Sequence, residues 1–380
     1  MKSSEDFGDI NSQSQLSTYR TKEAARVYAL SKDLFLPEAY ESLLGDKHHL
    51  GSGFEAHNIF PGFREEVMEF VKSRRIKWHD GTCDRSIVSS QVACLNCFFR
   101  FINDPVALGG WLSKLYPDLK EVLPISSSAE RALPDGSQPF VTFEWIGQRN
   151  YLNELRWGSR GQNCTSVDVV FRFRTIDGKI HIVIVEWKYC EDYHKAQYER
   201  ISINGTDRVS IYRPHLELDG CQLALGGTTF EDFFFSPLYQ MMRLQLLASA
   251  MEREREMDAD IVSVLHIVPR ANDGLLNAEL SQNIAPGKTV GDVWSNVTIP
   301  GRFKSVATED LIPMLVTSGA EPVWSEYVRK RYGAMAQPFR KHTMNMNETY
   351  ELFGHKGYPI RTFNDWEKHG GVAPSGETTS

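Results

Sequence analysis

The chain has 380 residues, with 42 Lys and Arg residues against 49 Asp and Glu residues and a formal net charge of −7. Apolar residues make up 41% of the chain and charged residues 24%, values that fit a folded globular protein and exclude a fibrous, collagen-like or wholly disordered one. The mildly acidic net charge also argues against a protein whose whole surface binds nucleic acid.

The sequence also excludes several cellular settings. No run of about 18 apolar residues is present, so we expect no transmembrane helix and no membrane partner. The polar, Ser-rich N-terminus lacks the apolar segment of a secretory signal. Six cysteines are too few for a disulfide scaffold, so we expect reduced thiols in a cytoplasmic protein. Cys94 and Cys97 have CxxC spacing, but without a four-ligand set we expect buried thiols there and no metal site.

Changes in sequence pattern along the chain predict one compact structure with helical and strand-rich parts. The polar residues 1–20 are predicted to form a disordered arm, and residues 369–380, with their Gly and Pro, a disordered tail. Helical periodicity dominates 21–135, which we expect to pack on a strand-rich core at 136–275. Residues 276–368 are predicted to form a less regular C-terminal extension. We find no internal repeat or long low-complexity linker between these parts.

The predicted elements run from helix to strand and back to helix. In chain order they are helices at 63–74 and 89–103, strands at 139–145, 166–174 and 180–189, helices at 191–201 and 236–255, a strand at 259–268 and a helix at 323–332. Asp177-Gly178 predicts a tight hairpin between the second and third strands. The third strand is an almost continuous apolar run, which indicates burial on both of its faces.

The most informative pattern joins Asp168 with Glu186, Trp187 and Lys188. Asp168 lies near the start of one predicted strand, and Glu186 and Lys188 lie near the end of the next, where residues two apart share a face. A hairpin that turns at position 177, midway between 168 and 186, brings the two acids opposite each other. Adjacent buried carboxylates repel each other, and a divalent cation such as Mg²⁺ resolves that conflict.

Lys188 adds a cation to this pair of acids. Beside a bound Mg²⁺ it could orient or deprotonate a water molecule, or balance the charge of a scissile phosphate. Such a site suits the hydrolysis of a phosphodiester. A bare Glu-x-Lys pattern is common on solvated strands, but here an apolar run precedes it and an acid lies upstream at the matching distance. These two features favour a catalytic site over a charged strand end.

An Asp followed 18 residues later by Glu-x-Lys on an apolar strand resembles the PD-(D/E)XK nuclease superfamily, which has the restriction-endonuclease-like fold. The order of the predicted elements also resembles the αβββαβ core of that family. The resemblance implies an α/β protein with a mixed central sheet flanked by helices, with N-terminal helical and C-terminal additions. Further stretches resemble an uncharacterised bacterial group of restriction-endonuclease-like proteins, namely Ser89–Gln91, Thr165–Asp168, Glu186–Tyr189 and Pro237–Gln240.

The resemblance assigns roles by position. It implies that Asp168 and Glu186 bind Mg²⁺, for which Mn²⁺ could substitute. The carbonyl oxygen of Trp187 would add a metal ligand, and Lys188 would assist the attacking water. Val167 stands where the motif has Pro, a departure that is common in the superfamily.

Many members of the superfamily carry a further acid on the helix before the first strand. The matching helix here offers Gln91 and no Glu, so Glu144 and Glu154 are the candidates for this role. Glu154 is preferred because it is nearer to Asp168 in the sequence and lies in a polar, Gly-rich stretch.

Five other polar residues are weaker candidates. Gln240, Arg243 and Gln245 lie on the long helix before the fourth strand, where the family often points a polar side chain at the active site. An amphipathic helix surface explains these three equally well. Arg156 and Arg160 lie in a loop that could approach the phosphates, although a solvated loop is the favoured interpretation.

Together these residues predict a Mg²⁺-dependent endonuclease that binds nucleic acid, with DNA as the expected substrate, and attacks phosphorus with an activated water. A nucleic-acid-binding protein without catalysis is the alternative. A glycoside hydrolase with Glu144 and Glu186 as its carboxylate pair is more remote, because Lys188 lies so close to one acid. A homodimer is a further expectation, since double-strand cutters often pair their active sites.

Overall fold

The structure is a computed structural model, and its described residues are 18–333 apart from 44–46, 79–80, 156, 162–163, 194–197, 203–204, 278–287 and 319–320. The predicted tail and nearly all of the predicted arm lie outside these residues. The last residues assigned to the arm are described, and they begin the helix α1 (Thr18–Ala29).

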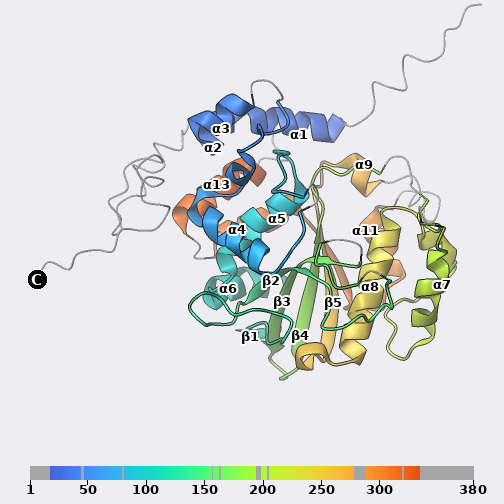
Figure 1. Ribbon diagram of the computed structural model, residues 1–380. Helices are drawn as coiled ribbons and strands as arrows, with labels where there is room; N and C mark the ends of the chain where they lie inside the picture. The colour runs from blue at the N-terminus through green and yellow to red at the C-terminus, as the bar shows by residue number, and fades with distance from the viewer. Residues whose placement is uncertain are drawn as a thin grey trace, which may run out of the picture.

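Within the described residues, a six-stranded mixed sheet occupies the centre of the molecule (Figure 1). Its strands are β1 (Leu119–Leu123), β2 (Val141–Trp145), β3 (Val167–Thr175), β4 (Ile180–Trp187), β5 (Ile261–Val268) and β6 (Phe303–Ala307). Their order is β1-β3-β4-β5-β6, and β2 also pairs with β3. β1, β2 and β4 are antiparallel to β3, whereas β4, β5 and β6 are parallel to one another.

Helices cover both faces of this sheet. Besides α1 they are α2 (Ser31–Leu34), α3 (Pro37–Ser42), α4 (Arg64–Ser73), α5 (Ser90–Phe98), α6 (Pro105–Leu115), α7 (Arg208–Tyr212), α8 (Leu238–Arg253), α9 (Asp273–Leu276), α11 (Val290–Asn296), α12 (Thr308–Val316) and α13 (Pro322–Tyr332). Figure 1 places α4, α5, α6 and α13 on one side of the sheet and α7, α8 and α11 on the other. One hydrophobic core includes Phe98 and Phe171, and the other includes Ile184 and Met242. The expected α/β class, with a mixed sheet flanked by helices, is confirmed.

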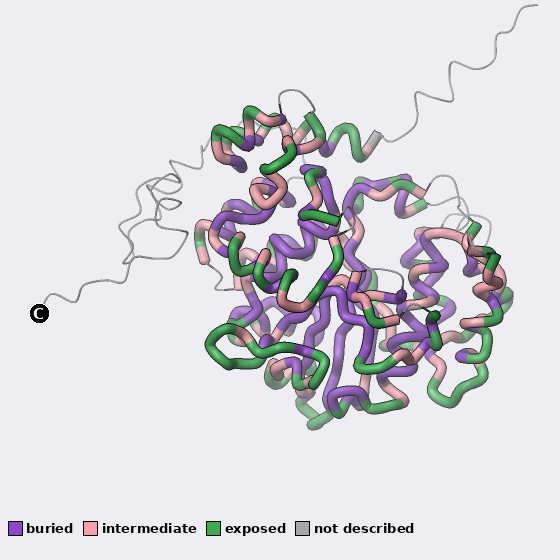
Figure 2. Tube along the Cα trace, in the orientation of Figure 1, coloured by how far each residue is buried: buried purple, intermediate pink, exposed green. Residues whose placement is uncertain are grey.

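The four predicted strands correspond to β2, β3, β4 and β5. All the residues of β4 are buried, as its apolar run predicts, and Figure 2 shows the inner strands as the most continuously buried part of the chain. β1 and β6 are not predicted from the sequence. Each is half exposed and carries polar residues such as Lys120 and Lys304, so neither has the apolar run that marks a central strand.

The hairpin between β3 and β4 forms as predicted. Gly178 in its turn has a φ of 88°, a left-handed conformation that favours glycine. Val169 pairs with Val185, and the same register continues to Arg174 opposite Ile180. One further step of this register places position 168 opposite position 186, which agrees with the arithmetic from the sequence.

The helix predicted at 191–201 is wrong for the described part of that stretch. Tyr198 instead makes an isolated β-bridge. The side-chain amide of Asn272, which follows β5, donates to the carbonyl oxygens of Tyr189 at 3.1 Å and Glu191 at 2.9 Å. These bonds hold the chain beyond β4 in a non-helical path.

Two further expectations concern membranes and cysteines. None of the helices in the described part of the chain has the length and apolar character that a bilayer span requires. None of the cysteines forms a disulfide, and Cys94 and Cys97 are both buried in α5, as predicted.

Candidate active site

Acidic residues from three neighbouring strands lie level with one another at one end of the sheet. The register of β2 on β3, read from the pairs on either side, places Glu144 opposite Asp168. The register of β3 on β4, continued by one residue, places Asp168 opposite Glu186. Glu186 in turn pairs with His266 of the parallel strand β5. One row of the sheet therefore carries three carboxylates and a histidine.

Hydrogen bonds fix Asp168 and Glu186 at the end of this row. The backbone N–H of Trp187 donates to Oδ2 of Asp168 at 2.7 Å, which ties the acid of β3 to the end of β4. Oε1 of Glu186 accepts from Gln240 Nε2 at 2.6 Å and from Lys188 Nζ at 2.7 Å. Oε2 of Glu186 is buried and has no hydrogen-bond partner among the described residues. The Glu186 carboxylate is therefore oriented by one oxygen while the other is left open.

Burial and mutual repulsion set the charges of this group. Burial, followed by the Glu186 and Glu144 carboxylates, raises the pKa of Asp168 well above its ordinary value. Burial also raises the pKa of Glu186, against the opposing effect of Lys188. Burial acts to lower the pKa of Lys188, but the Glu186 carboxylate outweighs it and holds that pKa well above the ordinary value. Lys188 is therefore a cation at neutral pH.

Glu144 is the acid that the structure brings beside Asp168. Its Oε1 accepts from Gln91 Nε2 at 3.1 Å, and its Oε2 accepts from Ser166 Oγ at 2.8 Å. The φ of Glu144 is 51°, in the left-handed region that is costly for a residue with a Cβ atom. Gly161 packs so closely that a Cβ there would lie 2.7 Å from a backbone oxygen and 3.4 Å from the Glu144 carboxylate. The loop before β3 is thus built around this carboxylate.

A small recess opens beside Glu144 and Asp168. Gln91 of α5 and the half-buried Trp78 line it together with the two acids, and apolar residues of α4, of the turn after α4, of α5 and of β2 complete its walls. The acids therefore lie beside a recess whose other lining residues are mainly apolar.

Residues 13–333 match the model of a family described as Restriction Endonuclease associating with ARP. The chain belongs to this family. The match extends from α1 to α13, so it includes the N-terminal and C-terminal helical regions as well as the sheet. No significant match was found to a curated protein or to a solved structure. The predicted resemblance to restriction-endonuclease-like proteins is confirmed, and the family description places the chain among DNA nucleases.

In this member of the restriction endonuclease family, Glu154 lies in a separate cluster. Its Oε2 accepts from the backbone N–H of Thr165 at 2.7 Å, and its Oε1 accepts from Thr165 Oγ1 at 2.6 Å and from Tyr212 OH at 2.8 Å. Arg243 Nε lies 3.8 Å from Oε1. Both oxygens of Glu154 are engaged within this cluster, so the geometry does not support the preference for Glu154 over Glu144.

The arginines of the same loop differ from their predicted placement. Arg160 is buried, and its guanidinium donates to Glu130 Oε2 at 3.1 Å and to Thr142 Oγ1 at 2.6 Å. This buried ion pair corrects the expected solvated loop, because the Glu130 carboxylate holds the guanidinium inside the fold. A phosphate would have to compete with Glu130 for it. Arg156 lies outside the described residues.

The three candidates on α8 have three different surroundings. Gln240 reaches the site and donates to Glu186. Arg243 donates from Nε to Thr165 Oγ1 at 2.9 Å and so supports the neighbouring cluster. Gln245 is fully buried and donates to a neighbouring glutamine at 2.6 Å, on a side of the helix that packs into the fold. Of these three residues, only Gln240 contacts the acids of the row.

The carboxylates suit Mg²⁺, which prefers hard oxygen ligands. Among the described residues, no group of three or more His, Cys, Asp or Glu side chains lies close enough to hold a metal ion. Mg²⁺ does not need such a cage, because it keeps several waters and binds through one or two carboxylates. The buried, unpartnered Oε2 of Glu186 is an atom that such an ion would satisfy. The residues present therefore fit the ion that the fold family implies.

His266 and the role of Gln91 are the features of the site that sequence reasoning misses. Burial, followed by the charge of Lys188, lowers the pKa of His266 to about 3, so its imidazole is neutral beside Glu186. Its position could be found from the sequence, because a helix between two strands implies parallel pairing. Gln91 stands where the resemblance to the PD-(D/E)XK superfamily implies a further acid, and here it donates to the acid Glu144.

Proposed function

We propose that this chain is a Mg²⁺-dependent DNA endonuclease whose active site is the row Glu144, Asp168 and Glu186 together with Lys188. The observation that carries this proposal is the Glu186 carboxylate, which has one oxygen oriented by Lys188 and Gln240 and one buried oxygen without a partner. Membership of a restriction endonuclease family supplies the substrate class, because those enzymes cut DNA.

We further infer that the core of the fold is restriction-endonuclease-like. The antiparallel strands β2, β3 and β4, the helix α8 and the parallel strand β5 follow one another as the βββαβ part of that core does, with α5 before them. The acids lie at the ends of β3 and β4, as the motif requires. β6 extends this core beyond β5, and β1 pairs with the C-terminal part of β3, next to the part that pairs with β2.

Metal binding would be the task of Asp168, Glu186 and the carbonyl oxygen of Trp187, with Glu144 as the accessory acid. When bound, Mg²⁺ supplies a Lewis acid that polarises the phosphate and a water. The Trp187 N–H keeps Asp168 turned toward β4, and Gln240 keeps Glu186 in one rotamer. These contacts give the carboxylates a fixed geometry before any ligand arrives.

Lys188 contributes a cation beside the carboxylates. Its Nζ lies 2.7 Å from Oε1 of Glu186, and without metal the Glu186 carboxylate holds the pKa of Lys188 above its ordinary value. We infer that Lys188 supplies a hydrogen-bond donor and a positive charge for the attacking water or the phosphate.

Cleavage of supercoiled plasmid and linear duplex DNA in Mg²⁺ or Mn²⁺ tests the proposal. Asp168→Asn and Lys188→Gln should each lower the rate by about 10²–10³, the usual effect of removing one charge that stabilises a transition state. Cleavage at the wild-type rate by both variants would show that the site is elsewhere. DNA binding without cleavage by the wild type in either metal would favour the binding-only protein, and activity on glycosides without a metal would favour a hydrolase that uses Glu144 and Glu186.

A further inference from the structure

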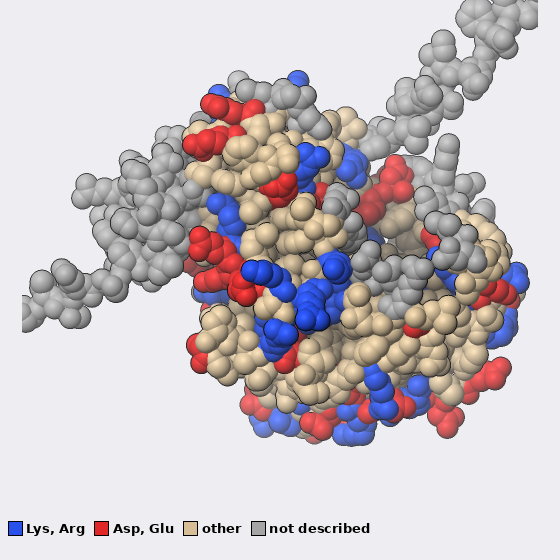
Figure 3. Space-filling view, in the orientation of Figure 1, with Lys and Arg blue, Asp and Glu red and all other residues tan. Residues whose placement is uncertain are grey.

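Charge is divided along α4 and the residues that follow it. After its first residue, Arg64, the helix carries Glu65, Glu66 and Glu69, whereas its end and the following turn carry Lys72, Arg74, Arg75 and Lys77. Figure 3 shows Lys and Arg side chains gathered in the middle of one face of the molecule, over the C-terminal end of α4. The acidic protein therefore has a local basic surface where this helix ends.

This basic end of α4 borders the recess of the active site. Ile76 and Trp78 line the recess together with Asp168, and Arg75 and Lys77, which alternate with them, are exposed. The backbone N–H of Lys77 donates to the carbonyl oxygen of Arg160 at 2.9 Å. Gln91, which supports the accessory acid, donates to the carbonyl oxygen of Lys77 at 3.3 Å. The segment is thus fixed to the same residues that build the site.

The exposed cations of this segment have no acidic partner. Arg74 is taken up by an ion pair with the buried Glu130. Within the part of the chain that the structure describes, the side chains of Lys72, Arg75 and Lys77 make no ion pair or hydrogen bond. These three cations, which are exposed next to residues that line the recess, are therefore available to a ligand from solvent.

Arg75 occupies a backbone position that normally belongs to glycine. Its φ is 54°, and the end of α4 closes with Ile76 N–H bonded to the carbonyl oxygen of Val71 at 3.0 Å and Arg75 N–H bonded to that of Lys72 at 3.1 Å. This pair of bonds is the Schellman arrangement, in which the left-handed residue is usually Gly because a Cβ atom is strained there. The helix end alone would favour Gly at this position, so the strain at Arg75 raises the question of what its side chain binds.

We propose that Arg75 and Lys77, with Lys72 beside them, form a rim that binds the DNA phosphate backbone and holds it against the acids. The inference rests on the proposed nuclease function. Cations are needed there because the carboxylate row would repel a polyanion, and a guanidinium can bind a phosphate through two parallel N–H donors. The rim does not recognise the base sequence of the DNA, since phosphate contacts position the protein without distinguishing bases.

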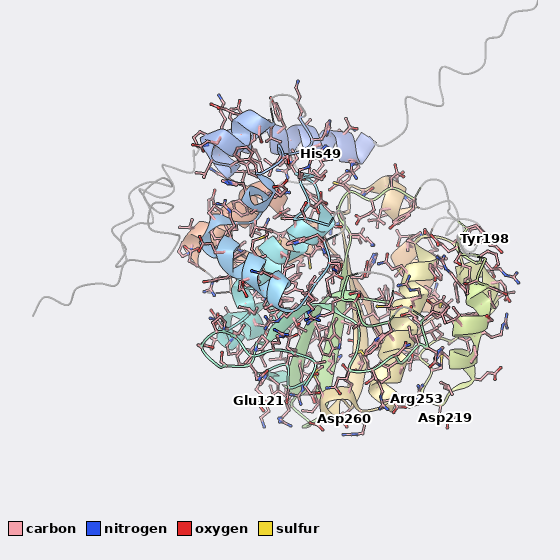
Figure 4. The ribbon with its side chains drawn as sticks, viewed as in Figure 1. His49, Glu121, Tyr198, Asp219, Arg253 and Asp260 are labelled. Carbon is pink, nitrogen blue, oxygen red and sulfur yellow. The ribbon has the colours of Figure 1, made fainter. Side chains whose placement is uncertain are left out.

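The structure offers a matched control for Arg75. Arg255 is also an exposed arginine with a left-handed backbone, at a φ of 51°. It follows α8 and pairs with Asp260 at 2.8 Å. Figure 4 labels Asp260 and Arg253 at the end of the sheet opposite to the recess. Arg255→Gly therefore removes the same charge from the same kind of backbone position, far from the proposed rim.

The test compares Arg75→Gly with Arg255→Gly in binding to a fluorescent duplex oligonucleotide without metal, over a range of salt concentrations. Arg75→Gly should weaken binding several-fold and reduce the slope of log K against log salt by about one, without lowering the midpoint of thermal unfolding. Arg255→Gly should leave both binding quantities at the wild-type values. Lys77→Gln should reproduce the loss of binding without a change of backbone strain.

Equal effects of Arg75→Gly and Arg255→Gly on DNA binding would overturn the proposed rim. Binding at the wild-type level by both Arg75→Gly and Lys77→Gln would overturn it as well. Cleavage by the wild type in Mg²⁺ is measured in parallel to separate the two proposals. A cutting wild type with wild-type binding by Arg75→Gly rejects the rim and leaves the nuclease. A wild type that binds but never cuts, with binding lost in Arg75→Gly, rejects the nuclease and keeps the rim. A wild type that neither binds nor cuts DNA overturns both.

Discussion

Glu154 and Glu186 are two buried glutamates near the same sheet, and their oxygens are used in opposite ways. Every oxygen of Glu154 accepts a hydrogen bond, from Thr165 or from Tyr212. Glu186 receives two donors on one oxygen and none on the other, and burial raises its pKa. A satisfied buried acid stabilises a fold, whereas an unsatisfied one is retained at a cost that a function must explain.

The comparison also shows why closeness in the sequence misleads at this site. Glu154 is nearer to Asp168 along the chain, but its loop folds away into the Thr165 cluster. Glu144 is further away along the chain, yet the antiparallel pairing of β2 and β3 brings it level with Asp168. Sheet register therefore decides which acids meet.

The largest expected effect is on stability at Glu154. Glu154→Ala should lower the free energy of unfolding by about 3 kcal/mol, because it leaves the buried donors of Thr165 and Tyr212 without an acceptor and Arg243 without its opposite charge. Glu186→Gln should change it by about 1 kcal/mol or less, because the amide oxygen still accepts from Gln240 and Lys188 and because the change removes the charge repulsion between Glu186 and Asp168. Urea unfolding without metal measures both values. Equal losses would remove the distinction between the two acids.

The response to Mg²⁺ should reverse the ranking of the two positions. At a free ion concentration of about a hundred times its Kd, binding should stabilise the wild type and Glu154→Gln by about 2.7 kcal/mol. Glu186→Gln should gain nothing, because it lacks the open carboxylate oxygen. Unfolding curves with and without Mg²⁺ give the three values. A full gain in Glu186→Gln would place the ion elsewhere.

The smallest effect concerns a buried base at the opposite end of β4. Burial, followed by the charges of Arg302 and Lys304, lowers the pKa of His181 to about 3. In the unfolded chain His181 binds a proton near pH 6.5, whereas in the folded chain it stays neutral down to about pH 3. Its contribution to the free energy of unfolding is therefore full above pH 6.5 and falls as the pH drops toward 3. Between pH 7 and pH 5, His181 should account for a loss of about 2 kcal/mol.

Denaturant unfolding of His181→Phe across this pH range checks the assignment. The aromatic ring keeps the contacts with Tyr116 and Phe173 but cannot titrate, although it leaves Ser263 without its partner. The variant should be less stable at pH 7 and should have a flatter pH dependence. The same slope in the variant and the wild type would assign the acid loss to other groups.

Those parts of the fold with a strong local signal could be predicted from the sequence. The apolar run of β4 and the turn at Asp177-Gly178 fix the hairpin, and the hairpin alone brings Asp168 opposite Glu186. The half-exposed strands β1 and β6 have no such run, so their place in the sheet depends on tertiary packing. The stretch after β4 is polar enough for a helix, but the Asn272 amide holds it otherwise.

The same limit applies to the site, because only the residues that a local pattern marks could be predicted from the sequence. Its two core acids and Lys188 follow from spacing, because strand geometry converts sequence distance into spatial position. The choice of Glu144 depends on the β2–β3 register, which no turn signal marks. Arg160 reads as a loop cation in the sequence, and only the packed fold reveals the buried Glu130 that holds it. The strained Arg75 is equally invisible until the end of α4 is seen.

Cleavage of duplex DNA in Mg²⁺ by the wild type, Glu186→Gln and Glu154→Gln, at equal concentrations of folded protein, tests the central claim most directly. The account predicts that the wild type and Glu154→Gln cut at similar rates and that Glu186→Gln is slower by about 10² or more. A loss of cutting in Glu154→Gln with activity retained in Glu186→Gln would contradict it.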